Sequence, residues 1–297
     1  MNKHYLVIPR IDVQRANAMV TAGVISLCPV MPAVMMGEAF GHATGLFPEG
    51  LMLVHHDAYL LAEQGLDHTS RSRVEHYPHQ FRGATVINGK DIAGGDKKTP
   101  SNSIQPTASM NGTWSVVMQF AADSADADTL LSACKQFFCR LARLAGGVIT
   151  DYAAPLVEDD LPKAMRACRG GFVVVDRSAW LLSDEQTRIE RLLAFADGSL
   201  QPEFEAPRRW LLPASLGYAL LTEPEDTEGA REGYPHAFAE TLLGLVELIS
   251  LRHTSAFQHE GGLEVEDNPD RTITPAESCF WRYSWPENDI FTLTQKV

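Results

Sequence analysis

The sequence predicts an α+β fold, and three observations lead to this class. Apolar runs of strand length alternate with segments of helical spacing, most clearly in the first 150 residues. The composition is that of an ordinary globular protein, with 45% hydrophobic and 21% charged residues. No run of about 20 apolar residues could span a membrane, so no membrane partner is expected. The 297 residues are enough for one large or two modest domains.

The first half predicts the order strand, helix, strand, arm, strand, helix, strand. Tyr5 to Pro9 is the first strand, and Pro9 should end it or lie at an edge because proline donates no ladder hydrogen bond. Pro32 begins a helix over 33–46, whose glycines at 37, 41 and 45 share one face and imply close packing. The remaining elements are strands at 50–62, 114–121 and 147–149 and a helix at 125–144. This βαββαβ order is the ferredoxin-like pattern, which RNA-recognition modules share with many other folds.

The second half alternates less cleanly. We interpret residues 1–150 as the core and 151–297 as a helical insertion followed by C-terminal strands and a helix that pack on it. The predicted elements are helices at 161–168, 184–196 and 236–251 and strands at 171–175, 209–217 and 279–285. Ser183 caps the second of these helices, with Gln186 as its capping-box partner. The last helix is the long apolar segment HAFAETLLGLVELISL.

Residues 65–113 differ from their surroundings, because they are rich in Gly, Ser, Thr, Pro and basic residues and poor in Leu. A structureless loop of this length is uncommon inside a domain unless it is functional. We interpret it as an extended hairpin arm whose cations neutralise nucleic-acid phosphates, with Tyr77 and Phe81 available to stack on bases. The cations assigned to RNA are Arg71, Arg73, Arg82, Lys97 and Lys98. The alternative is an ordinary surface loop.

The net charge of −13 argues against a free-standing nucleic-acid binder, which would normally be basic. A local basic groove on an acidic body is still compatible with it. Five scattered cysteines without a CxxC pair, and no signal peptide, favour reduced thiols in the cytoplasm.

Motifs for common enzyme classes are missing from the sequence. It has no GxSxG elbow, no GxxxxGK[ST] phosphate loop and no HExxH helix, so we expect no cofactor. His55 and His56 would point to opposite faces of a strand, which disfavours a metal site. His68, His76 and His79 lie in the arm, where two of them could act as acid and base in RNA cleavage.

Two polar segments near the ends of apolar runs are candidate RNA contacts. After the first strand, Arg10 and Arg15 suit phosphate, while the amides of Gln14 and Asn17 suit base edges or sugar hydroxyls. The alternative is a polar turn that closes on itself through Asn17. Arg140 and Arg143, three residues apart late in the helix at 125–144, form the second segment. Their alternative role is to favour the helix C-terminus electrostatically.

Segments along the whole chain resemble the Csy-two subunit of type I-F CRISPR complexes, which belongs to the Cas-five group. YLVIPRIDVQRANA resembles the opening of that family, and RLAGGVI resembles the segment before its central strand. The further similar segments, in chain order, are KAMRACRGGFVVVDRSAWLL, RRWLLPASLGYALL, FAETLLGLVELISL and WRYSW. Arg10, Gln14 and Asn17 match the opening motif, and Arg143 matches the arginine before the double glycine.

The resemblance implies a non-catalytic subunit with an RNA-recognition-like core, a projecting hairpin and a helical second part. It implies binding to the 5′ handle of the CRISPR RNA, beside the large subunit and the first repeated backbone subunit. We expect a separate large subunit to read most of the PAM, the short motif beside the target DNA, and a contribution from the arm is left open. Trp281, Tyr283 and Trp285 are candidates for the partner interface, because aromatics are enriched there; plain core is the alternative. The rival functions are a metal-independent repeat-RNA endonuclease of the same fold group and a protein-only adaptor.

Overall fold

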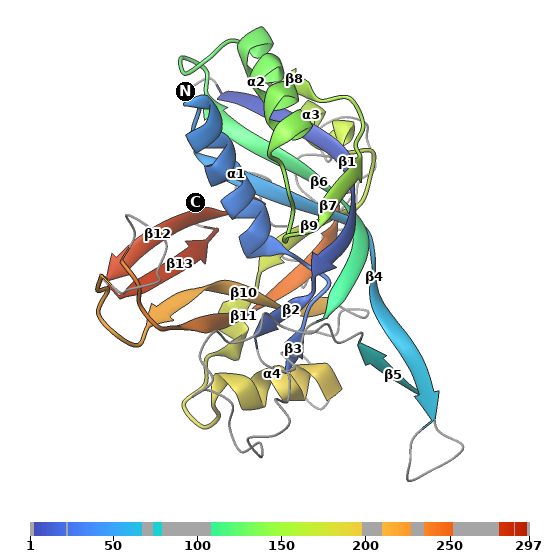
Figure 1. The fold of residues 1–297 in the computed structure, drawn as a ribbon, viewed down its shortest axis with the longest axis vertical. Helices are drawn as coiled ribbons and strands as arrows, with labels where there is room; N and C mark the ends of the chain where they lie inside the picture. Colours follow the sequence, from blue (N-terminus) through green and yellow to red (C-terminus); the bar gives the residue numbers. More distant parts are fainter. Residues whose placement is uncertain are drawn as a thin grey trace, which may run out of the picture.

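A computed structural model describes residues 3–21, 23–66, 74–78, 108–197, 210–226, 235–251, 279–287 and 289–295. The protein is a mixed α+β structure built on one large antiparallel sheet, with a few short helices (Figure 1). Nine strands follow the order β12-β13-β10-β11-β9-β4-β6-β1-β7, and β5 and β8 join at β4 and β1. The predicted α+β class is therefore confirmed, while the balance between strands and helices differs from the prediction.

The first half supplies one end of this sheet. Its elements are β1 (Lys3–Asn17), β2 (Met19–Thr21), β3 (Val24–Ile25), α1 (Val30–Thr44), β4 (Gly50–Leu66), β5 (Val74–Pro78), β6 (Ser109–Ala121), α2 (Ala127–Arg140) and β7 (Val148–Asp151). Strands β4, β6, β1 and β7 are neighbours in that order, and β2 and β3 form a separate small hairpin. Helices α1 and α2 pack against the same face of the sheet, where the largest hydrophobic cluster lies (Figure 1).

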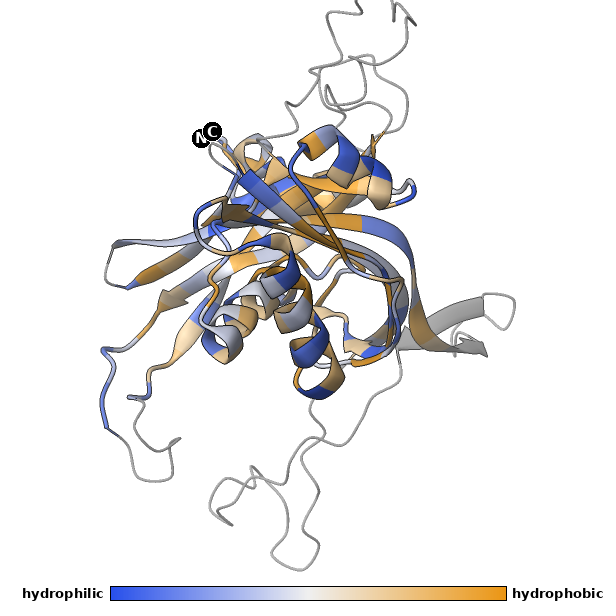
Figure 2. Cartoon of the chain, turned by 90° about the horizontal axis from the view of Figure 1, so that it is seen from above, coloured by the Kyte–Doolittle hydropathy of each residue, from blue (hydrophilic) through white to orange (hydrophobic). Residues whose placement is uncertain are grey.

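The glycine face of α1 permits the close packing that the sequence predicts. A Cβ at Gly37 would lie 3.2 Å from Leu51 Cδ1, and one at Gly41 would lie 2.4 Å from Phe47 Cδ1. Gly45 is not part of this face, because it takes a left-handed conformation and ends the helix. Along the helices and strands, hydrophobic and hydrophilic residues alternate (Figure 2), as expected when one side of each element is buried.

Strand β1 is much longer than the predicted Tyr5 to Pro9. The segment from Arg10 to Asn17, expected to follow the end of the strand, instead continues it. The prediction for Pro9 is wrong as well, because Pro9 lies inside a central strand. A β-bulge resolves the conflict: the register with β6 shifts between Ile8 and Ile11, so Pro9 needs no ladder partner for its nitrogen.

The second half extends the same sheet. Its elements are β8 (Leu156–Glu158), α3 (Leu161–Ala167), β9 (Phe172–Asp176), the 3₁₀ helix η1 (Ser178–Leu181), α4 (Arg188–Asp197), β10 (Leu211–Leu220), β11 (Ala239–Ser250), β12 (Arg282–Glu287) and β13 (Ile290–Thr294). Strand β9 connects the two halves, because it pairs with β11 on one side and with β4 on the other.

The helix predicted over residues 236–251 is wrong, since this segment forms strand β11. Its apolar run is almost continuous, and such a run fits a strand buried on both faces as well as a buried helix. The structure decides between them: Val246 belongs to the main cluster, Leu245 packs with η1 and α4, and Ile249 packs on the cluster under α3. The second half is therefore not a helical part but a strand-rich extension of the sheet.

Helix α4 begins later than predicted. Its capping box is formed by Thr187 and Glu190, not by Ser183 and Gln186. The Thr187 N–H donates to Glu190 Oε2 at 2.8 Å, and the Glu190 N–H donates to Thr187 Oγ1 at 3.3 Å. The Ser183 hydroxyl instead accepts from the Glu185 N–H in the turn before the helix.

The predicted arm begins as a hairpin. Residues 62–66 of β4 pair with β5, and this hairpin projects from the body of the protein (Figure 1). Arg71, Arg73, Arg82, Lys97 and Lys98 lie outside the described residues. None of the described helices is both long and apolar enough to cross a membrane.

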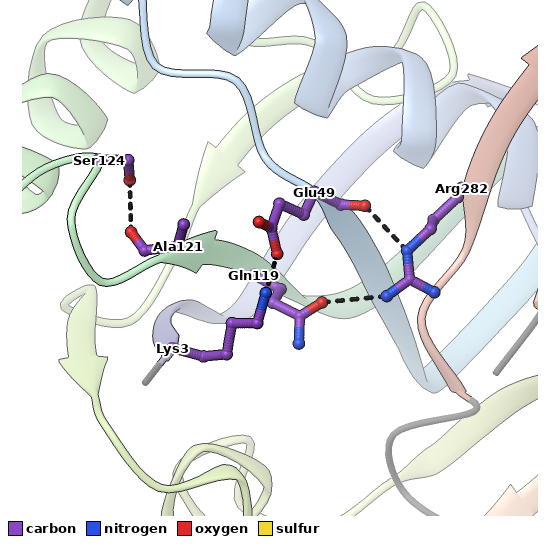
Figure 3. A network of polar contacts seen from close by, with 6 residues as sticks. All are labelled: Lys3, Glu49, Gln119, Ala121, Ser124 and Arg282. Carbon is purple, nitrogen blue, oxygen red and sulfur yellow. Dashed lines mark hydrogen bonds and ion pairs between the residues drawn. The ribbon is translucent and has the colours of Figure 1, made fainter. Parts of the chain in front are cut away.

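A polar network fastens the C-terminal strands to the first half (Figure 3). Arg282 of β12 donates from Nε to the Glu49 carbonyl at 3.1 Å and from Nη2 to Gln119 Oε1 at 3.2 Å. Glu49 also pairs with Lys3 at the start of β1. Four segments far apart in the sequence are thereby held together where β4 begins.

Candidate nucleic-acid interface

The sheet face opposite α1 and α2 changes character along its length. Under α3 it is apolar, with Val7, Val54 and Val117 in one buried cluster. Because side chains alternate along a strand, the same face continues past these residues with polar groups. This surface, called the polar face below, consists of Arg10, Asp12 and Arg15 of β1, His56, Asp57 and Tyr59 of β4, and Asn111, Thr113 and Ser115 of β6.

Bulges in β1 bring its arginines to this face. Two residues of β1 oppose one residue of β6 at Pro9–Arg10 and again at Gln14–Arg15. Each bulge restores the alternation that keeps Ile11, Val13 and Ala16 in the main core. Without them, the residues that follow Pro9 would turn their apolar side chains to solvent.

Ser115 is the centre of the first bulge. Its buried hydroxyl accepts from the Arg10 N–H at 2.8 Å and lies 2.6 Å from His56 Nε2. Beside it, Thr113 donates to Asp12 Oδ1 at 2.6 Å. These contacts link β1, β6 and β4, so the backbone at Arg10 is held in a fixed position.

His56 is uncharged at neutral pH. Burial lowers the pKa of His56 to about 4, and the nearby positive charge of Arg10 acts in the same direction. Burial also lowers the pKa of His55, whose Nδ1 accepts from Trp114 Nε1 at 3.1 Å in the core. The two histidines therefore lie on different faces, as predicted. Across the described residues, no cluster of three or more His, Cys, Asp or Glu could hold a metal ion.

The second bulge is held by Asn111. Its Oδ1 accepts from the Arg15 N–H at 2.9 Å, and its Nδ2 donates to the Tyr59 hydroxyl at 3.0 Å. Tyr59 is 56% exposed, so it offers an aromatic surface on the side of Asn111 opposite Arg15. Asn17, in contrast, closes on Met19 through both ends of its amide, at 3.0 and 3.1 Å. The local turn predicted as the alternative for Asn17 is thus what its side chain forms.

The second predicted segment packs directly on the first. The Asn17 N–H donates to the Ala145 carbonyl at 2.8 Å, and Gly147 lies so close to β1 that an added Cβ would be 2.8 Å from the Gln14 carbonyl oxygen. Ala145 and Gly146 both have positive φ, the pattern of a type I′ turn. Gln14 and Arg143 are exposed on either side of this contact.

Arg140 and Arg143 do not share a helix face. Helix α2 ends at Arg140, four residues before the predicted end. After the helix ends, the chain turns so that Leu144 is fully buried in the core. Arg143 therefore lies outside the helix and not one turn after Arg140 on its surface. Both arginines are exposed, and neither forms an ion pair with a described residue.

Left-handed backbone conformations mark three arginines. Outside glycine, φ is positive among the described residues only at Arg10 (49°), Arg15 (54°), Ala145 (50°) and Arg169 (58°). This conformation is uncommon for residues with a side chain and costs about 1–2 kcal/mol each. Arg169 was not selected from the sequence, and neither were His56, Tyr59 or Ser115. Spacing alone gives no signal for them, because the bulges decide which side of the sheet they reach.

The predicted partner residues separate into core and surface. Trp281 is fully buried and donates from Nε1 to the Val174 carbonyl at 3.2 Å, so it belongs to the core rather than to an exposed interface. Tyr283 and Trp285 are 42% and 57% exposed, and both rings contact Phe291.

These features define an α+β protein with two helices across one face of a broad antiparallel sheet and a polar patch with bulge arginines on the other. The chain matches the family of the CRISPR-associated protein Cas_Csy2 over residues 6–292, and it belongs to that family. The family comprises Csy2 subunits of type I-F CRISPR Csy complexes, so the resemblance seen in the sequence is confirmed. None of the curated proteins matches the chain.

Proposed function

We propose that this chain is a non-catalytic subunit that binds the 5′ handle of the CRISPR RNA through the polar face. The observation that carries the proposal is the pair of exposed arginines, Arg10 and Arg15, fixed at bulges on one face that also exposes Tyr59. Arginine forks suit phosphate, and an exposed aromatic ring suits stacking on an unpaired base. We assign the exposed Gln14, Arg143 and Arg140 to the same RNA contact, and the cations of the arm would contact RNA from outside the described residues.

We propose that the first half of the chain, which carries the polar face, is a ferredoxin-like unit. Its support is the order β4-β6-β1-β7, with α1 between β1 and β4 in the chain and α2 between β6 and β7. We further propose that residues 1–150 carry RNA recognition and that 151–297 support it. The large subunit and the repeated backbone subunits would bind outside the polar face, in part at Tyr283 and Trp285, and the arm would lie near the PAM of target DNA.

A first prediction tests the RNA site. Arg10→Ala with Arg15→Ala should weaken binding of a repeat-derived 5′ handle RNA by roughly a hundredfold, because each arginine supplies one charge-assisted phosphate contact. Fluorescence anisotropy with the full-length chain and with the assembled complex measures this loss. Arg188→Ala, which removes a charge from α4, is the matched control. Equal RNA affinity in the double variant and in the control would contradict the assignment of the polar face.

Absence of catalysis is supported by the environment of the one serine–histidine pair on this face. Ser115 lies 2.6 Å from His56 Nε2, but it is fully buried and its hydroxyl already accepts from the Arg10 N–H. An attacking hydroxyl needs access to its substrate, so this pair serves structure. Incubating the purified chain with repeat RNA in chelator checks the point: intact RNA is expected, and specific cleavage that is lost in His56→Gln would reverse it.

A further inference from the structure

The turn between α3 and β9 has an unusual backbone. Arg169, Gly170 and Gly171 have φ values of 58°, 88° and 105°, so three consecutive residues are left-handed. A glycine is the usual residue at the first left-handed position after a helix. Here that position holds an arginine although two glycines follow it. The side chain at 169 is therefore kept at a conformational cost.

This turn lies against the centre of the polar face. A Cβ at Gly171 would lie 2.8 Å from His56 Nδ1, so only glycine lets the turn approach this closely. On the other side of Arg169, the buried Cys168 thiol donates to the Ala164 carbonyl at 3.6 Å; burial raises the pKa of this thiol, and the Ser115 hydroxyl beside it acts in the opposite direction. The residues flanking Arg169–Gly170 thus lie beside both members of the pair that holds Arg10 in place.

The groups that the turn exposes suit an anion. Arg169 is exposed and forms no ion pair with any residue that the structure describes. Within the same part of the chain, the N–H groups of Gly170 and Gly171 make no hydrogen bond. The right-handed Cys168 and left-handed Arg169 end the helix, and their own N–H groups bond back to the Met165 and Arg166 carbonyls, so the N–H groups left to face an anion are those of Gly170 and Gly171. Because the C-terminus of α3 would repel a negative ligand, the guanidinium is needed to hold it.

We infer that Arg169, with the N–H groups of Gly170 and Gly171, binds a phosphodiester group of the same single-stranded RNA. The strand then crosses the polar face from Arg15 and Arg10 on β1 to the α3–β9 turn beyond β4. This inference rests on the proposed function and adds a third contact point, contributed by the second half of the chain.

The salt dependence of binding tests this contact. For single strands, the slope of log K against log salt concentration changes by about 0.7 for each phosphate neutralised. Arg169→Gly should make the slope shallower by that amount and weaken binding roughly tenfold at low salt. The full-length chain, with and without its co-expressed partners, is titrated with a 5′ handle RNA. The matched control is Arg188→Ala. This arginine lies in α4, which packs on η1 and β10, so the variant should change neither the slope nor the affinity.

Thermal unfolding separates binding from folding. Glycine accepts the left-handed conformation, so Arg169→Gly should unfold at a temperature no lower than the unsubstituted chain. An unchanged slope and affinity in Arg169→Gly, with weaker binding in Arg10→Ala, would overturn this contact and leave the proposed function standing. If the unsubstituted chain failed to bind the RNA both alone and with its partners, the contact at Arg169 and the proposed function would both be overturned.

Discussion

At the scale of single residues, strain and charge coincide on the polar face. Arg10 and Arg15 each adopt a left-handed backbone that glycine would adopt without cost, yet each has an exposed guanidinium. Both backbone N–H groups donate to side chains of β6, Ser115 and Asn111, which hold the strained conformations. Residues of this kind are common at functional sites, where surrounding contacts compensate for the strain.

A second prediction follows for Arg15. Arg15→Gly should raise the melting temperature or leave it unchanged, whereas Arg15→Ala should lower it slightly, because alanine keeps the steric conflict and loses the side chain's contacts. Both variants should bind the handle RNA more weakly by the same factor. Thermal unfolding and anisotropy on the same preparations measure the two effects. A lower melting temperature for glycine than for alanine would show that φ at residue 15 imposes no strain.

A third prediction concerns pH. Burial and Arg10 lower the pKa of His56 to about 4, and burial lowers the pKa of His55 as well. Between pH 6.5 and 4 the unfolded chain therefore binds protons that the folded chain does not, so stability falls as pH falls through this window. We expect a lower melting temperature at pH 5 than at pH 7.

His56→Gln should reduce this pH dependence, because its amide can still reach Ser115 but does not titrate. The comparison uses the difference in melting temperature between pH 7 and pH 5 for each protein. The same difference in variant and unsubstituted chain would mean that His56 remains solvated in the folded protein.

At the scale of elements, strands were harder to predict than helices. Helices α1, α2 and α3 form close to their predicted ranges, because caps, glycines and 3.6-residue spacing are local signals. Strand β11 was mistaken for a helix because its apolar run lacks alternation, and β1 was cut short at Pro9. In both cases the neighbouring strands decide: β11 lies between β10 and β9, and β1 bulges against β6.

A fourth prediction tests the junction of β10 with β13. A Cβ at Gly217 would lie 2.0 Å from the Phe291 carbonyl oxygen, a backbone atom that cannot move without breaking the pairing. Gly217→Ala should therefore lower the free energy of unfolding by about 3 kcal/mol or more. Gly23→Ala, also at positive φ but with nothing within 4 Å of the new Cβ, should cost only about 1 kcal/mol. Denaturant unfolding of both variants measures the difference, and equal losses would contradict the clash.

At the scale of the whole molecule, the two halves share one sheet. Strand β9 lies between β4 and β11, Trp281 fills the core next to Val174, and Arg282 binds Glu49 and Gln119 of the first half. The second half thus extends the sheet that carries the polar face and completes the core beneath that sheet. Residues near the C-terminus complete packing that begins at β1.

A fifth prediction uses the two neighbouring tryptophans of this region. Trp281→Ala should cost about 3–5 kcal/mol of stability, because it empties a fully buried site. Trp285→Ala should change stability little, since this residue is 57% exposed. If this surface is an interface, the variant should recover less of the other complex subunits in co-purification. Thermal unfolding and pulldown of the tagged chain give both readings. Full recovery of the partners with Trp285→Ala would remove it from the interface.

The sequence by itself determined the α+β class, most helices, the family and the choice of Arg10, Gln14, Arg15 and Arg143 as exposed polar residues. These features depend on local periodicity and on ordered similarity along the chain. Only the tertiary structure decided that residues 10–17 are a bulged strand, that residues 239–250 join the sheet, and that the turn after α3 lies against His56 of the polar face. The physical reason is that strand pairing, bulges and close backbone approach depend on partners distant in sequence, which no local pattern records.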